Sequence, residues 1–403
     1  MARHLFTNAS VFDGTGSPPA EGQVLVEDGR ILEVGSGLDG DDLIDLGGGT
    51  LLPGLFDTHV HLTIGHVDQW ALIHEPFSLQ FFEAARNLRA TLDAGITTVR
   101  DAGGADLGIK EAVERGMIAG PRMQVSLIML SQTGGHGDGW LASGNDTELF
   151  LTHPGRPSGI VDGPEEMRRK VRELIRAGAD VIKVATSGGV LSPRDEPTHA
   201  HFTSDELEML VAEAAMAGKW VMAHAQATDG IKNAVRAGIR SIEHGIYLDD
   251  EAIEMMLEHG TYLVPTLVAP TGVLRAGEAG APIPRVILDK AEMVVEVHRD
   301  SFRRAVEAGV KVAMGTDSGV TPHGENLREL ELMAEGGMAP GDVLRAATAV
   351  AAELMGVDDD RGTIEAGKAA DLVVLDGDPY VFDGFRERIR AVYQDGTLVS
   401  GGV

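Results

Sequence analysis

The chain has 403 residues, a formal net charge of −28 at pH 7, 43% hydrophobic residues and no cysteine. This length suits a barrel plus an accessory module better than one small domain. The negative charge argues against nucleic acid as a partner, and the lack of cysteine excludes disulfides and thiolate metal ligands.

The N-terminal segment predicts short β strands. Leu5 to Phe12, Gly22 to Val26 and Ile31 to Val34 have strand-like patterns, and the turn at Asp28-Gly29 is a strong hairpin signal. The first residues lack the apolar core of a signal peptide, and no run of about 18 apolar residues occurs. We therefore expect a soluble cytoplasmic protein with no membrane contact, and we expect a homo-oligomer.

The middle of the chain alternates short apolar runs with amphipathic stretches, which is typical of parallel βα units. The eight predicted strands are Leu55–His61, Thr97–Ala102, Met123–Leu130, Val181–Thr186, Trp220–His224, Ser241–His244, Tyr262–Leu267 and Val312–Asp317. The predicted helices include Phe81–Ala94, Pro164–Ala177, Ser204–Ala217 and Asp249–His259. Eight strands favour a closed (β/α)₈ TIM-type barrel, in which functional groups lie at the carboxyl ends of strands.

The C-terminal segment returns to the pattern of the N-terminus, with strand-like runs at Asp371–Leu375 and Ala391–Tyr393. Neither end can bury a β face alone, so we expect the two ends to pair. The predicted organisation is a small β-sandwich module from residues 1–52 and 358–403, and a barrel from residues 53–357. Two long connections, Ser131 to Gly163 and Ser187 to Thr203, are typical of binding loops.

The first predicted barrel strand ends in Asp57-Thr58-His59-Val60-His61. Alternate side chains of a strand share a face, so Asp57, His59 and His61 point the same way. Two imidazoles at a strand end can hold a metal ion, although hydrogen bonding alone is an equal interpretation of this pair. Asp57 could orient one of the histidines.

Lys183 interrupts the apolar run of the fourth predicted strand. Burial of an unpaired ammonium is costly, so the pKa of Lys183 should fall towards that of a neutral amine, which can react with carbon dioxide to form a carbamate. Pairing with a nearby carboxylate is the alternative, and taken alone it is favoured.

Three more predicted strands end in a metal-ligand residue type: His224, His244 and Asp317. Each is weak by itself. Together with His59, His61 and Lys183 they place six candidate ligands at the strand ends of one barrel, which favours a metal centre.

The segments Pro53 to His61 and Gly362 to Leu372 resemble the amidohydrolase superfamily, and the resemblance covers nearly the whole chain. The candidate ligands resemble those of its binuclear-metal subtype. The resemblance implies two divalent ions, most often Zn²⁺, bridged by N6-carboxylysine at Lys183 and by a hydroxide. It places His59, His61 and Asp317 on the more buried metal and His224 and His244 on the more exposed one. Asp317 would accept the proton of the attacking hydroxide and pass it to the leaving amine.

Ala185 to Val190 and Ser192 to Asp195 most resemble the Xaa-Pro dipeptidase, or prolidase, and carboxypeptidase-like branch. The resemblance implies a small-molecule or short-peptide substrate with an amide next to a free carboxylate, and places His136 against the scissile group or that carboxylate. A solvent-exposed His136 is an equal alternative. Arg194 could bind the carboxylate, or it could be a surface residue. Many relatives have Tyr where this chain has Gln226, a departure that puts the exact substrate in question.

Three other functions compete. The same site could hydrolyse an ester, lactone, carbamate or cyclic amide, because the same hydroxide attacks any activated carbonyl. A mononuclear deaminase would have a glutamate three residues after His224, where this chain has Ala227. An inactive structural homologue would be expected to lose ligands, yet all six candidates are present.

Overall fold

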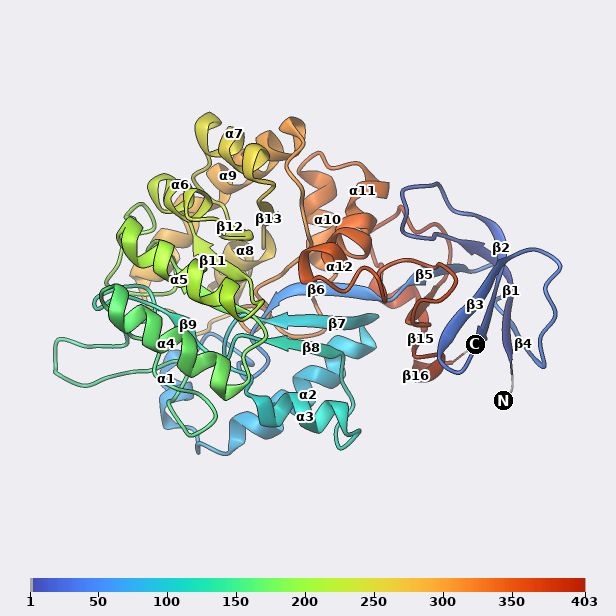
Figure 1. Ribbon diagram of the computed structural model, residues 1–403, viewed down its shortest axis with the longest axis horizontal. Coiled ribbons are helices and arrows are strands. Elements are labelled where there is room, and N and C mark those ends of the chain that lie inside the picture. Colours follow the sequence, from blue (N-terminus) through green and yellow to red (C-terminus); the bar gives the residue numbers. More distant parts are fainter. Residues whose placement is uncertain (1–2, 403) are drawn as a thin grey trace.

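The computed structural model describes residues 3–402. Residues 1, 2 and 403, which belong to the predicted β module, lie outside the described residues. Figure 1 shows a β sheet that holds both chain ends, next to a larger body in which strands alternate with helices. The fold is mixed α/β. No helix in residues 3–402 combines the length and the apolar character needed to cross a membrane.

The two ends of the chain share one eight-stranded sheet, in the order β16-β15-β14-β5-β1-β2-β3 with β4 beside β1. Its strands are β1 (His4–Val11), β2 (Ala20–Glu27), β3 (Arg30–Gly35), β4 (Asp42–Asp45), β5 (Thr50–Pro53), β14 (Leu372–Leu375), β15 (Ile389–Gln394) and β16 (Thr397–Gly401). The predicted hairpin is present between β2 and β3, and Asp28 (φ 51°) and Gly29 (φ 77°) both adopt the left-handed conformation that such turns require. β14 pairs antiparallel with β5, which joins the C-terminal strands to the N-terminal ones.

The larger body contains two parallel sheets, ordered β6-β7-β8 and β13-β12-β11-β10-β9. Their strands are β6 (Leu55–Val60), β7 (Ile96–Asp101), β8 (Arg122–Val125), β9 (Met129–Leu130), β10 (Ile182–Ala185), β11 (Val221–Ala225), β12 (Ser241–His244) and β13 (Tyr262–Val264). Every neighbouring pair in both sheets is parallel, as the alternation of strands and helices predicts.

The predicted third strand, Met123–Leu130, is divided into β8 and β9. Leu127 lies between them with φ 70°, a left-handed conformation in which a regular strand cannot continue. β8 stays with β7, whereas β9 pairs with β10.

The predicted eighth strand, Val312–Asp317, forms no regular ladder but does connect the two parallel sheets. Val312 makes a parallel bridge to Leu263 of β13, and Ser318 makes one to Val60 of β6. Backbone hydrogen bonds follow the same path, from Ala313 N–H to Leu263 and from Asp317 N–H to His59. Residues 312–318 therefore lie between β13 and β6.

The helices are α1 (Gln69–His74), α2 (Leu79–Asp93), α3 (Leu107–Glu114), α4 (Pro164–Ala177), α5 (Ser204–Met216), α6 (Thr228–Arg236), α7 (Asp250–His259), α8 (Val268–Glu278), α9 (Arg285–Ala308), α10 (Arg328–Glu335), α11 (Pro340–Ala346) and α12 (Ala349–Met355), with a 3₁₀ turn at Arg386–Arg388. Local signals fix their ends. Pro164 opens α4 and Gly178 ends it with φ 101°, while the side chain of Asp249 caps α7 by accepting the N–H of Ala252.

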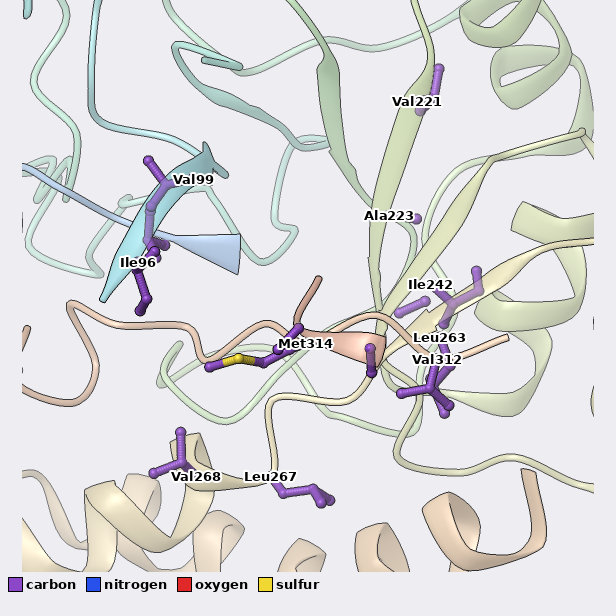
Figure 2. Packing of buried hydrophobic residues seen from close by; sticks show 14 of the residues in the cluster. Ile96, Val99, Val221, Ala223, Ile242, Leu263, Leu267, Val268, Val312 and Met314 are labelled. Atoms are coloured by element: carbon purple, nitrogen blue, oxygen red, sulfur yellow. The ribbon is translucent and has the colours of Figure 1, made fainter. Parts of the chain in front are cut away.

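The parallel strands have one apolar and one polar face. Val184 and Ile242 join the large hydrophobic cluster that also contains helix residues, whereas their neighbours Lys183 and Glu243 face the other way. Figure 2 shows Leu263, Val312 and Met314 in this cluster, where β13 meets residues 312–318. The apolar cluster fixes the strands, and the opposite face carries the candidate site.

Candidate metal centre and substrate pocket

The nine residues that the sequence predicts as metal ligands or substrate contacts line one pocket of about 280 Å³. They are His59, His61, His136, Lys183, Arg194, Gln226, His224, His244 and Asp317. The six candidate ligands come from β6 and the residue after it, from β10, β11 and β12, and from residues 312–318. The four histidines lie at or next to the carboxyl ends of their strands, whereas Lys183 is the second residue of β10. The fold thus brings together side chains that are far apart in the sequence.

The carboxylate of Asp317 lies at the centre of the candidate ligands. Its Oδ1 is 3.4 Å from Nε2 of His59 and 3.1 Å from Nε2 of His61, and Nζ of Lys183 is 3.4 Å from the same His59 nitrogen. Ligand atoms of His59, His244 and Asp317 all lie within 4.8 Å of one another. These spacings fit side chains that converge on one cation.

Hydrogen bonds orient three of the imidazoles towards this cluster. Nδ1 of His59 is 2.7 Å from Oε2 of Glu243, and Nδ1 of His61 is 2.7 Å from the carbonyl oxygen of Gly103. Nδ1 of His244 is 2.6 Å from Oγ1 of Thr266. With Nδ1 engaged, Nε2 is the nitrogen left to act as a ligand, which is the usual arrangement in metal sites.

His224 is oriented the other way, because its Nε2 is 3.1 Å from the carbonyl oxygen of Gly188. A carbonyl accepts only from N–H, so the lone pair of His224 is on Nδ1. Its ring centroid is 4.6 Å from that of His244. Burial is the main cause that holds the pKa of both His224 and His244 well below the usual range, which keeps these rings neutral and able to bind a metal.

Lys183 is 1% exposed. Burial is the main cause that lowers the pKa of its ammonium to about 8. A substantial fraction of the side chain is therefore a neutral amine near pH 8, as the apolar strand around it predicts. No described carboxylate lies within ion-pairing distance of Lys183, so the alternative of direct pairing is not observed.

A buried ion pair lies beneath the cluster. Arg100 of β7 donates to Oε1 of Glu243 at 3.0 Å and to the carbonyl oxygen of Thr58 at 2.7 Å. Burial alone would raise the pKa of Glu243, but the charge of Arg100 and the hydrogen bond with His59 bring it to about 2. Glu243 is therefore an anion that accepts the proton on Nδ1 of His59.

Glu243 and Arg100 were missed in the sequence. Each is a charged residue in a fully buried strand, on the face opposite to the hydrophobic cluster, but its strand contains other polar residues, so it does not stand out as Lys183 does.

Asp57 was expected to orient one of the histidines, but its carboxylate contacts the imidazole of neither His59 nor His61. It binds backbone groups instead. Its carboxylate accepts the N–H groups of His59 and Thr316, both at 3.1 Å, and the side-chain amide of Asn326 at 2.8 Å. The imidazole of His59 is held by Glu243 instead. Asp57 thus ties β6 to residues 312–318, which carry Asp317.

Two candidate ligands have strained backbones. His244 has φ 73° and Asp317 has φ 62°, in a region that costs a non-glycine residue about 1–3 kcal/mol. Such conformations persist where the surrounding structure enforces them, commonly at functional sites. At His244 the chain leaves β12, and the side chains of both residues line the pocket.

The three residues expected near the substrate differ in their surroundings. His136 is partly buried, and its ring stacks on His224. Arg194 is exposed and its guanidinium lies 5.2 Å from the ring centroid of Trp140 at the pocket rim. Gln226 is 4% exposed, and its Oε1 has no hydrogen-bond partner within residues 3–402. Of the two interpretations of His136, a solvent-exposed side chain is therefore not observed.

Known proteins resemble this chain in sequence and in structure. Residues 50–401 match the Amidohydrolase family. An ochratoxinase from Aspergillus niger is 36% identical over 344 residues, which cover 82% of this chain and 70% of that enzyme. A solved Xaa-Pro dipeptidase with methionine bound in its active site is 34% identical with a TM-score of 0.90, covering 99% of this chain and 100% of that one. A prolidase complexed with N-methylphosphonate-L-proline is 36% identical with the same TM-score and the same coverage.

Proposed function

Because the chain belongs to the amidohydrolase family, we propose that it hydrolyses an amide bond next to a free carboxylate, as in dipeptides or N-acyl amino acids. The observation that carries the proposal is the convergence of His59, His244 and Asp317 within 4.8 Å, in the pocket that also contains His136. The related dipeptidase and prolidase have bound an amino acid or a proline derivative. Both of these ligands carry a carboxylate.

We propose that the six candidate ligands hold two divalent cations, and that these are Zn²⁺, in keeping with the donor types. The donors fit, since they include the neutral imidazoles of His224 and His244, the ionised carboxylate of Asp317 and a lysine amine of lowered pKa. When bound, such cations make water more acidic and polarise a carbonyl. His59, His61 and Asp317 would hold one cation, and His224 and His244 the other.

We propose that Lys183 is carboxylated and bridges the two cations. Its neutral amine can add to the carbon of carbon dioxide and lose a proton, which gives a carbamate with two oxygens. The lowered pKa of Lys183 supports this reaction, because a protonated amine has no lone pair for the addition.

Asp317 would move the proton during hydrolysis. Burial opposes its ionisation, but the neighbouring His59 and His61 hold its pKa well below the usual range, so Asp317 is ionised before the reaction. It would accept the proton that the attacking water loses and deliver it to the departing amine. Its position between the two imidazoles limits its motion and keeps it pointed into the pocket.

His136 would bind the substrate carboxylate, and the guanidinium of Arg194 at the rim would be a second contact. This arrangement would place the scissile carbonyl over the ligand cluster, because His136 lies on the ring of His224. Gln226 stands where many relatives have a tyrosine, and it offers an amide with an unpaired oxygen in place of a phenol. This difference favours a substrate that differs from those of the relatives in the part that contacts Gln226. An ester, lactone, carbamate or cyclic amide is therefore the second candidate.

We also propose a closed (β/α)₈ barrel from residues 53–357, and a small β module, of sandwich type, from residues 1–52 and 358–403. The bridges from residues 312–318 to β13 and β6 support closure, and the shared sheet of both chain ends supports the module. The cytoplasmic location and the homo-oligomer stay predictions from the sequence.

A substrate screen tests the proposal. Zinc-loaded protein would be assayed against dipeptides, N-acyl amino acids and lactones, with Asp317→Asn protein as the control for contaminating hydrolases. Turnover of dipeptides or N-acyl amino acids that Asp317→Asn protein lacks would support the proposed function. Faster turnover of lactones than of any amide would favour the second candidate.

A further inference from the structure

Three polar side chains link helix α9 to the wall of the pocket. Lys290 on α9 is 5% exposed, and Asp195, in the loop after β10, is 7% exposed. Nζ of Lys290 lies 3.4 Å from Oδ1 of Asp195, and Oδ2 of the same carboxylate lies 3.0 Å from Nδ1 of His136. The three residues come from three distant segments of the chain, so it is the fold that assembles this series of contacts.

Lys290 fixes the loop that carries Asp195. Besides the Asp195 side chain, its ammonium donates to the carbonyl oxygens of Gly189 at 3.2 Å and Ser192 at 2.9 Å, and to that of Asp195. A buried ammonium is tolerated only when its donors are satisfied, and here one turn of the loop satisfies them. The position of the Asp195 carboxylate is therefore set from α9.

Asp195 in turn sets the orientation of His136. With Nδ1 engaged by the carboxylate, Nε2 is the nitrogen that remains for the pocket. The ring has little freedom to turn, because it stacks on His224, and a Cβ on Gly189 would lie only 2.3 Å from its Cε1. The N–H of Gly189 also donates to Oδ2 of Asp195 at 3.1 Å, which keeps the loop against the ring.

Charge balance gives Lys290 a second role. A lone carboxylate at Asp195 would repel an anionic substrate bound at His136. The ammonium of Lys290 offsets that charge from the opposite side of the carboxylate. The series Lys290–Asp195–His136 therefore directs Nε2 of His136 to the pocket without adding a net negative charge, and this nitrogen can donate to a substrate carboxylate when it carries a proton as Nδ1 does.

We propose that Asp195 and Lys290 are positioning residues of the subsite for the substrate carboxylate, which hold His136 with Nε2 towards the pocket. This inference rests on the carboxylate-binding role proposed above for His136. Neither Asp195 nor Lys290 was identified from the sequence as part of that role.

Binding of two matched ligands tests the inference without turnover. L-methionine and L-methioninamide differ only in the carboxylate, and their affinities for the metal-loaded protein can be measured by calorimetry. Asp195→Asn should lower the affinity for L-methionine by about 10- to 100-fold, as expected for loss of a charge-assisted hydrogen bond. It should lower the affinity for L-methioninamide by less than about threefold. Lys290→Met should act in the same direction, and Lys290→Arg should retain more of the discrimination.

Lys170→Met is the matched control for loss of a buried lysine. Lys170 is 7% exposed on α4, pairs with Glu173 at 3.0 Å and does not line the pocket. This variant should bind both ligands as the wild-type protein does. Asp195→Asn is nearly isosteric, so it keeps the inference testable if Lys290→Met fails to fold.

A double variant distinguishes positioning from direct contact. In a His136→Ala background, Asp195→Asn should cause no further loss of affinity for L-methionine, because Asp195 acts through His136. Additive losses, or equal weakening of both ligands, would overturn the inference.

The wild-type protein separates the two levels of the proposal. If it binds L-methionine and L-methioninamide equally, the carboxylate-binding role of His136 is wrong, and the inference falls with it. If the wild-type protein prefers L-methionine over L-methioninamide and the Asp195→Asn protein shows the same preference, only the inference is wrong.

Discussion

The imidazole of His136 stacks on that of His224, with ring centroids 4.2 Å apart and planes 16° from parallel. His224 belongs to β11 of the parallel sheet, whereas His136 belongs to the long loop after β9. The contact places a loop residue against a candidate metal ligand. Substrate recognition and bond cleavage are therefore expected to depend on neighbouring side chains, and they can be separated by single substitutions.

Lys183→Ala should lose metal and activity together, because the substitution removes the group that is expected to bridge two cations. Elemental analysis of wild-type protein expressed with zinc and bicarbonate should give about two ions per chain. Short carboxylic acids should restore part of both losses by occupying the vacated position. A Lys183→Ala protein that binds two ions with wild-type affinity would show that Lys183 is no bridge.

Asp317→Asn should lower kcat by about 10²- to 10⁴-fold, the usual contribution of a general base. The side chain keeps one oxygen that can bind metal, so most of the metal should remain. Stopped-assay kinetics and elemental analysis of the same preparation check both points. Activity within a few-fold of wild type would mean that another group transfers the proton.

Glu243→Gln should lower the free energy of unfolding by about 3–5 kcal/mol, because the charge of buried Arg100 would lose its partner. Urea unfolding followed by circular dichroism measures this loss. Glu251→Gln is the matched control, since Glu251 pairs with Lys232 at an exposed position and should contribute less than about 1 kcal/mol. Equal effects of the two substitutions would contradict the account of the buried pair.

Glu329 should make stability depend on pH. Burial is the main cause that raises the pKa of its carboxyl group from 4.5 to about 8, although it accepts the N–H groups of Leu267 and Val268. Since the folded-state pKa is the higher one, stability from the protonated group is complete below about pH 4.5 and is lost as the pH rises to about 8. The melting temperature of Glu329→Gln, relative to that of the wild-type protein, should therefore rise as the pH increases across this window. A difference in melting temperature that stays constant from pH 5 to pH 9 would contradict this prediction.

The strand ends were predictable because their signals are local. The alternation of side chains in a strand places His59 and His61 on one face, and a lysine within an apolar run marks Lys183. Lys183 is buried and has a lowered pKa, as the sequence indicates. The division of the third strand was not predictable, since nothing in the sequence signals that Leu127 takes a left-handed conformation.

Residues that act through others were also not predictable. Lys290 is one of many charged residues on the amphipathic helix α9, and only the tertiary structure brings it to Asp195. Asp57 shares a strand face with the candidate ligands, but its partners in residues 312–318 and at Asn326 are distant in the sequence. Spacing in the sequence predicts which side chains share a face of a strand, whereas the tertiary structure determines which groups each side chain contacts.

The central claim is that the pocket hydrolyses an amide next to a free carboxylate, and a matched substrate pair tests it most directly. The measurement is kcat/KM of the zinc-loaded protein for a dipeptide and for the same dipeptide amidated at its C-terminus. We predict that amidation lowers kcat/KM by about 10²-fold or more, because charge-assisted hydrogen bonds to the carboxylate each contribute about 1.5–3 kcal/mol. His136→Ala should reduce that ratio. Equal kcat/KM values for the two substrates would contradict the claim.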